Sequence, residues 1–327
     1  MMLAGDVGGT KTLLSFFEIR DDQLVELKRK KYASNDYESL EIILTDFLSD
    51  VNGKIESAAF KVPGPVIDGK AKPTNLKWSL DAKKISSQFN IPIVNFLNDL
   101  SAAAFAVPYL TKTEIIEIKK GSEKLLSERF TVIAPGTGLG EAFLICENGK
   151  KIVLSSEGGH SDFAPTNEME AELFKYLNKK FGRVSYERII SGSGLPNVFD
   201  FLVDCKYGVP ENKTLERMKT EDRAVVISEM ALNKNDKVCE DALEIFVSVL
   251  GAHSSNCVLT NLTTGGVYLG GGIPFKILPM LQGKIFLNSF LNKGRLSSLI
   301  EATPIYLINN NNAALIGAAW YAVNSKK

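Results

Sequence analysis

The chain has 327 residues, more than a single hydrophobic core usually serves, so two domains are expected. Hydrophobic residues make up 45% and charged residues 23%, the composition of an ordinary folded globular protein. Lys plus Arg and Asp plus Glu are equal at 38 each, and the sequence has no basic stripe, so we expect no nucleic-acid partner.

The cysteines and the N-terminal residues indicate a cytoplasmic protein. The four cysteines have no CxxC or metal-type spacing, which favours reduced thiols over disulfides or a zinc site. The first residues, MMLAGDVGG, lack the basic and apolar regions of a signal peptide. No stretch is expected to reach the apolar length of a membrane span, so we expect a soluble protein without a membrane partner.

The N-terminal third predicts strands followed by helices. An apolar strand up to Val7, a tight turn and the strand LLSFFEI form a hairpin, and LVELKRKKYA alternates like a third strand. YESLEIILTDFLSD carries one helical stripe of apolar residues. SAAFKV and IPIVNFL are predicted strands, and LSAAAFAV is a small-residue helix. This order predicts a mixed sheet covered by helices.

The same scheme starts again at Phe130. Strands are predicted at FTVIA, AFLIC and KIVLSS, the last two joined by a type I′ turn at Asn148-Gly149. Helices dominate from about Asn167 to Asn261, and GGVYLGGGI is a buried strand that runs into a glycine turn. The strand TPIYLI and the helix NAALIGAAWYAV follow. Two related halves would explain why the order of strand, Gly-Thr turn and strand occurs twice.

Two glycine turns are candidate phosphate-binding sites. Glycine lets backbone N–H groups approach phosphate oxygens, and each turn adds a threonine hydroxyl, although either turn alone could be only a hairpin turn. No Walker A motif, dinucleotide fingerprint or protein-kinase motif set is present, which leaves a cradle of β-turns as the nucleotide hypothesis. The candidate residues are Asp6, Gly8, Gly9 and Thr10 in the first turn, and Gly136, Thr137 and Gly138 in the second.

Two further features near glycine have simpler interpretations. Lys11 could contact phosphate, but an exposed lysine on a hairpin is the simpler interpretation. Gly271 and Gly272 belong to a glycine run after a buried strand, where the backbone could lie against an adenine ring. On its own, a strand-to-helix turn explains that run better.

Asn98 and Asp99 end a predicted strand and begin a helix. Either residue suits a helix N-cap, which is the simpler interpretation. The alternative is that Asp99 is a general base at the carboxyl end of a strand, where open α/β sheets place their ligands.

A histidine and two glutamates are candidates for binding a polyol. Glu157 and His160 share one glycine-flanked loop, and Glu187 lies in VSYERIISG. Carboxylates and a neutral imidazole are the usual partners of vicinal hydroxyls. A metal site would need a third ligand such as Asp162, and Glu-x-x-His-x-Asp has no standard coordination geometry. Sugar contacts are therefore favoured.

Phosphoryl transfer requires positioning, neutralisation of charge by Mg²⁺ and a carboxylate that accepts the proton of the attacking hydroxyl. The chain offers one part for each role: glycine turns for the phosphates, Asp6 towards the metal through water, and Asp99 as the base. The combination is more specific than any of its members.

Taken together, these motifs resemble the bacterial glucokinase family, within the hexokinase/actin/Hsp70 ATPase superfamily. They occur in the family's order and spacing over essentially the whole chain, and EGGHSDFAP is the most specific of them. The matching stretches are GDVGGT (5–10), FLND (96–99), APGTGLG (134–140), EGGHSDFAP (157–165), ERIISGSGL (187–195) and GGVYLGGGI (265–273).

The resemblance implies roles for single residues. The aspartate of FLND is the family's catalytic base, which corresponds to Asp99, and the preceding Asn98 also touches the sugar. Glu157, His160 and Glu187 correspond to residues that bind glucose hydroxyls. The resemblance further implies ATP with Mg²⁺, closure of two domains on D-glucose, and a homodimer.

The chain departs from the family pattern in two places, and three other functions remain open. Lys11-Thr12-Leu13 stands where relatives often have Asn and then Arg, and Ser193 where they often have proline. A ROK-type kinase of another hexose usually carries a cysteine cluster after its ExGH loop, and this chain has no cysteine between Cys146 and Cys205. A sugar and nucleotide sensor without catalysis, or an actin-like ATPase, would share the glycine turns.

We therefore expect a two-domain α/β protein with the ribonuclease-H-like (actin-like ATPase) fold, in which helices flank mixed sheets and a cleft separates the domains. Residues 1–109 plus 303–327 form the predicted small domain, and residues 110–302 the large one. The expected function is ATP-dependent phosphorylation of D-glucose at its 6-hydroxyl.

Overall fold

The computed structural model describes residues 1–51, 53–73, 75–122 and 127–326. It divides into two compact units. The first contains Met1–Lys112, Leu144–Ser155 and Asn310–Lys327, and the second contains Thr113–Phe143 and Ser156–Asn309. The domain boundaries expected near residues 109 and 303 stay a prediction.

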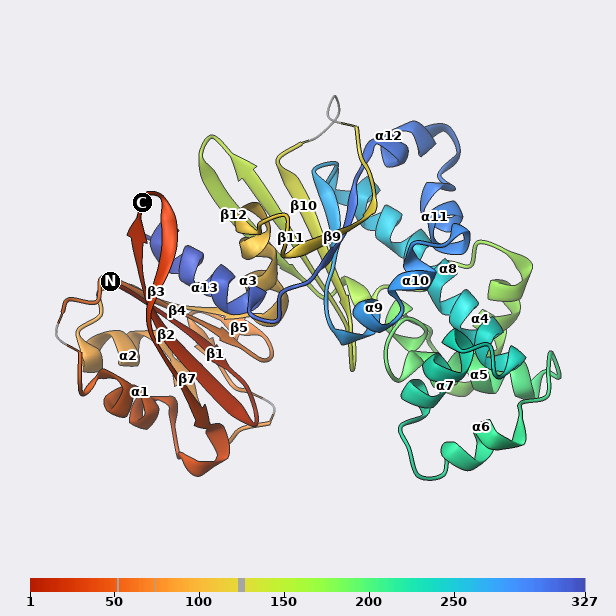
Figure 1. Ribbon diagram of the computed structural model, residues 1–327, viewed down its shortest axis with the longest axis horizontal. Coiled ribbons are helices and arrows are strands. Elements are labelled where there is room, and N and C mark those ends of the chain that lie inside the picture. The colour runs from red at the N-terminus through yellow and green to blue at the C-terminus, as the bar shows by residue number, and fades with distance from the viewer. Residues whose placement is uncertain (52, 74, 123–126, 327) are drawn as a thin grey trace. The chain divides into compact units, whose positions relative to one another are not determined.

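A five-stranded mixed sheet forms the centre of the first unit (Figure 1), in the order β3-β2-β1-β4-β8. β1 pairs antiparallel with β2 and parallel with β4, and β4 pairs parallel with β8. The predicted N-terminal hairpin and third strand are confirmed. The strands are β1 (Met2–Val7), β2 (Lys11–Arg20), β3 (Gln23–Ala33), β4 (Ser57–Val62) and β8 (Val94–Asn98).

Helices cover both faces of this sheet because its strands alternate between two cores. Phe16 and Phe60 pack with α1 and α2 on one face, whereas the neighbouring Phe17 and Ala59 pack with α3 and α13 on the other. A small three-stranded sheet was not predicted. The remaining elements of the unit are α1 (Leu40–Leu48), α2 (Ala82–Phe89), α3 (Asp99–Ala106), α13 (Ala313–Asn324), the 3₁₀ turns η1 (Ser34–Asp36) and η2 (Val107–Tyr109), and the strands β5 (Val66–Ile67), β6 (Lys70–Ala71) and β7 (Leu80–Asp81).

The second sheet has six strands in the order β12-β11-β10-β13-β14-β9. Its first five positions repeat the strand order of the first sheet, which confirms the predicted repeat. Asn148 and Gly149 have φ of 52° and 74°, as the predicted type I′ turn requires. β9, an antiparallel edge strand beside β14, was not predicted. The strands are β9 (Ile115–Lys119), β10 (Arg129–Pro135), β11 (Leu139–Glu147), β12 (Lys150–Ser156), β13 (Gly266–Leu269) and β14 (Ile305–Ile308).

The helices of the second unit follow the predicted helical stretch and continue beyond it. Most lie between β12 and β13, and the rest lie between β13 and β14 (Figure 1). They are α4 (Glu168–Phe181), α5 (Gly194–Asp204), α6 (Asn212–Arg217), α7 (Arg223–Leu232), α8 (Lys237–Asn261), α9 (Gly272–Lys276), α10 (Leu278–Leu281), α11 (Lys284–Leu291) and α12 (Ser297–Ala302), with 3₁₀ turns η4 (Gly158–His160), η5 (Tyr186–Arg188) and η6 (Gly294–Leu296).

Helix α8 corrects one expectation. Its mean hydropathy is 1.4 over 18 residues, so α8 is long and apolar enough to qualify as a membrane span. No stretch of the sequence was expected to reach that length. However, 72% of that window is buried inside the protein. Leu243, Phe246 and Leu250 belong to the core that α8 shares with α5, α7 and α11. The structure therefore makes α8 the central core helix of its unit.

Helices α3 and α13 approach closely at a single glycine. A Cβ placed on Gly317 would overlap the carbonyl oxygen of Ala102 and lie 3.0 Å from the Ala106 amide nitrogen. The small residues of both helices permit this approach, and Ala318 and Ala102 are fully buried beside it. Because Asp99 is the first residue of α3, this contact also fixes where Asp99 lies.

We predict that Gly317→Ala lowers the free energy of unfolding by about 2 kcal/mol, because overpacking at a backbone contact forces the two helices apart. Chemical denaturation measures this. Gly272→Ala is the control, since no atom lies within 4 Å of a Cβ there. Equal stability of the two variants would contradict the packing argument.

Candidate functional site

Ser34 stabilises the first glycine turn through two hydrogen bonds. The Gly8 amide donates to the Lys11 carbonyl oxygen at 2.9 Å, which closes the turn. Ser34 Oγ donates to the Gly8 carbonyl at 2.7 Å, and the Ser34 amide donates to the Thr10 carbonyl at 3.0 Å. Asn75 packs over Gly9, where a Cβ would lie 2.8 Å from that of Asn75. Sequence reasoning missed Ser34, because its burial behind the turn exists only in the folded structure.

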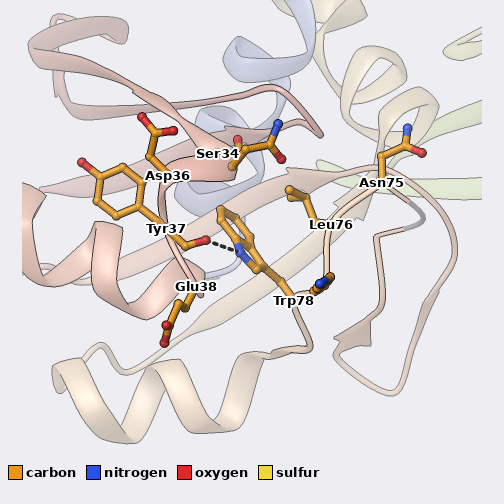
Figure 2. Close-up of a pocket in the computed structure, with 9 residues that line it drawn as sticks. Ser34, Asp36, Tyr37, Glu38, Asn75, Leu76 and Trp78 are labelled. Atoms are coloured by element: carbon orange, nitrogen blue, oxygen red, sulfur yellow. Dashed lines mark hydrogen bonds between the residues drawn. The ribbon is translucent and has the colours of Figure 1, made fainter.

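A pocket of about 700 Å³ adjoins this turn at Ser34 (Figure 2). Trp78 forms part of its wall and donates from Nε1 to the Tyr37 carbonyl oxygen at 3.0 Å. None of the predicted site residues lines it. The lining residues are Ser34, Asn35, Asp36, Tyr37, Glu38, Asn75, Leu76, Lys77 and Trp78.

The structure separates the roles of Asn98 and Asp99. Asn98 is the N-cap of α3, because its Oδ1 accepts a 2.7 Å hydrogen bond from the Ser101 amide. Asp99 is therefore not needed as a cap. Its side chain is 46% exposed, but Oδ1 is enclosed and accepts no hydrogen bond of good geometry from the described residues.

Lys61 links Asp99 to Asp6. Its Nζ lies 2.9 Å from Asp6 Oδ1 and 3.2 Å from Asp99 Oδ1. The pairing of strands explains the cluster: Asp6 faces Lys61 in the β1–β4 register, and Asn98 faces Val62 in the parallel β4–β8 pair. Sequence reasoning missed Lys61, although a lysine in the otherwise apolar SAAFKV strand was a usable signal.

Burial and the neighbouring charges both shift the pKa values of Asp99 and Lys61. Burial raises the pKa of Asp99 and Asp6 adds to the rise, while Lys61 opposes it, and the result is a pKa above the ordinary value. Burial lowers the pKa of Lys61, but Asp6 and Asp99 outweigh it, so Lys61 remains charged. The Lys61 ammonium therefore forms ion pairs with both carboxylates. A carboxylate with a raised pKa is a better proton acceptor near neutral pH.

The second glycine turn packs against Glu187. The Gly136 amide donates to the Gly138 carbonyl at 2.8 Å, and the Gly136 carbonyl accepts from the Gly192 amide at 2.7 Å. Glu187 Oε2 accepts from the Leu139 amide at 2.9 Å, and a Cβ on Gly138 would lie 2.5 Å from that oxygen. Gly138 is therefore required for Glu187 to reach this turn.

The loop that carries Glu157 and His160 is pinned beside the segment that carries Glu187. Arg183 donates from Nη2 to the His160 carbonyl at 2.6 Å, and the Tyr186 amide donates to the Ser161 carbonyl at 3.1 Å. His160 Nδ1 then lies 3.7 Å from Glu187 Oε1. Glu157 and His160 are both exposed. The structure thus brings the three predicted sugar-binding residues onto two adjacent turns of the second unit.

The third glycine run is a strand-to-helix turn. Gly271 has φ of +87°, which favours glycine, and Gly272 begins α9. Nearby, Gly192 and Ile273 belong to the lining of a small apolar pocket of about 60 Å³, which also includes Leu195 and Ile277.

Asp6 offers the chemistry that Mg²⁺ prefers. Its carboxylate is 28% exposed, and its Oδ1 lies 2.9 Å from Lys61 Nζ. Mg²⁺ usually keeps several waters and takes one or two carboxylates plus substrate phosphates, so a single partly exposed carboxylate beside a glycine turn fits it.

Comparison with known proteins identifies the family. The family model described as glucokinase matches residues 3–325. Glucokinase of Nostoc punctiforme is 38% identical over 98% of both chains. The crystal structure of a glucokinase from an Antarctic psychrotroph, 29% identical, aligns with a TM-score of 0.88 over 99% of this chain and 98% of that one.

A more distant structure shares the fold alone. The ROK family glucokinase from Streptomyces griseus is 19% identical and aligns with a TM-score of 0.56, over 98% of this chain and 99% of that one. The predicted actin-like α/β architecture is thereby confirmed. Since the glucokinase family model spans nearly all of the sequence and full-length relatives exceed 30% identity, the chain belongs to the glucokinase family.

Proposed function

We propose that the protein transfers the γ-phosphoryl group of ATP to the 6-hydroxyl of D-glucose, with Asp99 as the general base. The observation that carries this proposal is that Asn98 and Asp99, at the end of β8, make different contacts. Asn98 caps the helix, which leaves the Asp99 carboxylate partly exposed and with a raised pKa, and its one ion pair with the described residues is the contact with Lys61. Such a group can accept the hydroxyl proton as the phosphoryl group is transferred.

Glucose recognition is assigned to Glu157, His160 and Glu187. Their carboxylate and imidazole atoms are exposed or half-buried, so they are available to hydroxyl groups. Glu187 keeps Oε1 for a ligand, because Oε2 is taken by the Leu139 amide. Asn98 contributes its amide nitrogen, since its Oδ1 is taken by the cap.

ATP is assigned to the glycine turns. Gly8, Gly9 and Thr10 form one turn, and Gly136, Thr137 and Gly138 form the other. The Gly8 and Gly136 amides close their own turns, so the proposed phosphate contacts are the other N–H groups and the threonine hydroxyls. Gly271 and Gly272 place backbone near the apolar pocket at Ile273, which suits the base. Asp6 would hold Mg²⁺ through water, and Mg²⁺ supplies neutralisation of phosphate charge when bound.

Substrate choice distinguishes this function from its rivals. Coupled-assay turnover with Mg-ATP is expected to be highest on glucose and negligible without sugar. Activity mainly on another hexose or on an N-acetylated sugar would favour a ROK-type specificity. Hydrolysis of ATP without sugar would favour an ATPase, and no activity at all would favour a sensor. The homodimer and the cytoplasmic location stay predictions.

We predict that Asp99→Asn lowers kcat by about 10²–10⁴-fold with little change in glucose affinity, because the lost interaction acts mainly in the transition state. Steady-state kinetics and calorimetric glucose binding measure the two effects. Asp81→Asn is the matched control: Asp81 caps α2 through the Lys83 and Lys84 amides, a role that asparagine can fill. An Asp99→Asn variant with most of its turnover would refute the general base.

We predict that Lys61→Met moves the acidic limb of the kcat/KM profile to higher pH. The base must be ionised to accept a proton, so activity is lost as pH falls through the pKa of Asp99. Without Lys61, the positive charge that lowers the pKa of Asp99 is lost, whereas burial and Asp6 still raise that pKa. Lys61→Arg, which keeps the charge, is expected to restore the limb towards its original position. A limb that does not move in Lys61→Met would show that Lys61 does not act on the base.

We predict that Gly138→Ala weakens glucose binding about tenfold or more, because the added methyl group displaces Glu187 Oε2 and with it a sugar contact. Gly136→Ala, in the same turn, is the control, since a Cβ there meets no atom within 4 Å. Calorimetry with glucose in the absence of nucleotide measures both. Equal loss in both variants would assign the effect to the turn as a whole instead of Glu187.

A further inference from the structure

Three metal-ligating side chains meet beneath the loop that carries Glu157 and His160. Glu141 comes from β11, and His253 and Cys257 lie one helical turn apart on α8. Each of the three is buried, and their donor atoms all lie within 4.8 Å of one another. Neither the nucleotide nor the sugar assignment uses any of these residues. The sequence did not predict this cluster, because its members come from two elements that lie far apart in the chain.

The two separations that involve the sulfur match a tetrahedral metal, and the third involves the other oxygen of the Glu141 carboxylate. With the usual Zn–S and Zn–N or Zn–O bond lengths, sulfur lies about 3.6 Å from each lighter donor at the tetrahedral angle. Cys257 Sγ lies 3.8 Å from His253 Nε2 and 3.7 Å from Glu141 Oε2. The third pair, Nε2 and Glu141 Oε1, is 2.5 Å apart and shares a proton as a hydrogen bond.

Metal binding would replace that proton. Coordination through Nε2 requires the proton on the other ring nitrogen, and Nδ1 of His253 has no hydrogen-bond partner among the described residues. The Nε2–Oε1 pair must open to about 3.3 Å, the separation of two light donors on one tetrahedral ion. The Cys257 thiol must also lose its proton, because the thiolate is the ligand.

Charge balance favours a divalent ion. Glu141 is 3% exposed and His253 is 3% exposed, so an uncompensated charge here would be costly. A carboxylate, a thiolate and a neutral imidazole together neutralise an ion of charge +2. Thiolate and imidazole select Zn²⁺-type ions over Mg²⁺, which prefers oxygen ligands.

The cluster also has an open side. All three residues line a pocket of about 670 Å³ within the second unit, whose wall includes Ser156, Asn256 and Thr260. A water from this pocket can fill the fourth coordination position, as in zinc sites with three protein ligands. The pocket also provides a route by which the ion reaches the buried donors.

We propose that Glu141, His253 and Cys257 form a binding site for a divalent transition metal of the Zn²⁺ class, separate from the Mg²⁺ that accompanies ATP. The site lies directly under the candidate sugar loop: a Cβ on Gly158 would overlap Glu141 Oε2. The loop between Glu157 and His160 therefore rests on one of the metal's ligands. A movement of Glu141 towards an ion would therefore change its contact with that loop.

Cobalt titration of the full chain tests the site without reference to catalysis. The purified protein is freed of metal with a chelator, kept reduced, and titrated with CoCl₂. We expect one equivalent to bind with a near-ultraviolet thiolate-to-cobalt band and visible bands typical of four-coordinate Co²⁺. ZnCl₂ is expected to displace the cobalt, and MgCl₂ is not. Absence of stoichiometric binding, or displacement by Mg²⁺, would overturn the proposal.

Cysteine variants assign the band. Cys257→Ser is expected to abolish the thiolate band and weaken cobalt binding at least about 100-fold, since even outer-shell changes cost about 10–100-fold. Cys239→Ser, on the same helix, and Cys205→Ser, at an exposed position, are the controls and should bind as wild type. A band that persists in Cys257→Ser, or is lost in Cys205→Ser, would place the metal elsewhere.

A measurement on the unmutated chain guards against misfolded variants. X-ray absorption at the zinc edge of the one-equivalent Zn²⁺ complex is expected to show one sulfur at about 2.3 Å and lighter ligands at about 2.0–2.2 Å, including an imidazole. A first shell of oxygen atoms alone, or of several sulfurs, would contradict the Glu-His-Cys assignment.

Discussion

The ammonium of Lys61 between two carboxylates is the interaction on which the proposed roles of Asp6 and Asp99 depend. β1, β4 and β8 run parallel, so Asp6, Lys61 and Asp99 arrive at the same edge of the sheet. Without a cation there, two nearly adjacent carboxylates would repel each other in a poorly solvated place. Lys61 makes their closeness possible, Asp99 has a raised pKa, and its Oδ1 accepts no hydrogen bond of good geometry from the residues that the structure describes.

Close backbone contacts at glycine impose the second constraint. Gly317 lets α13 lie against α3, and so fixes the helix that begins with Asp99. Gly138 admits Glu187 to the second turn, and Gly158 lets the sugar loop rest on Glu141. In each case the missing Cβ leaves room for a contact that positions a side chain with a proposed role, namely Asp99, Glu187 or Glu141. These glycines serve the site through packing, whether or not their N–H groups touch a phosphate.

Helix α8 contributes residues both to the core of the second unit and to the pocket beneath the loop that carries Glu157 and His160. Phe246 and Leu250 anchor one part of the helix in the core, while His253, Asn256 and Cys257 reach the pocket behind the sugar loop. Asn256 donates to the Tyr186 hydroxyl at 3.1 Å, and Tyr186 directly precedes Glu187. A rigid, buried helix therefore supports the segments that carry His160 and Glu187. Its high hydropathy reflects this central position.

The sequence alone determined the features that depend on near neighbours. Alternation and helical stripes predicted the principal strands and helices, the Asn148-Gly149 turn has the expected backbone, and the glycine, FLND and EGGH motifs led to the glucokinase family. Only the tertiary structure decided that Asn98 caps α3, that Lys61 joins Asp6 to Asp99, and that Glu141 meets His253 and Cys257. It also added β9 and made α8 a core helix. Local patterns are set by side chains a few positions apart, whereas these contacts join distant segments and exist only once the strands have paired and the helices have packed.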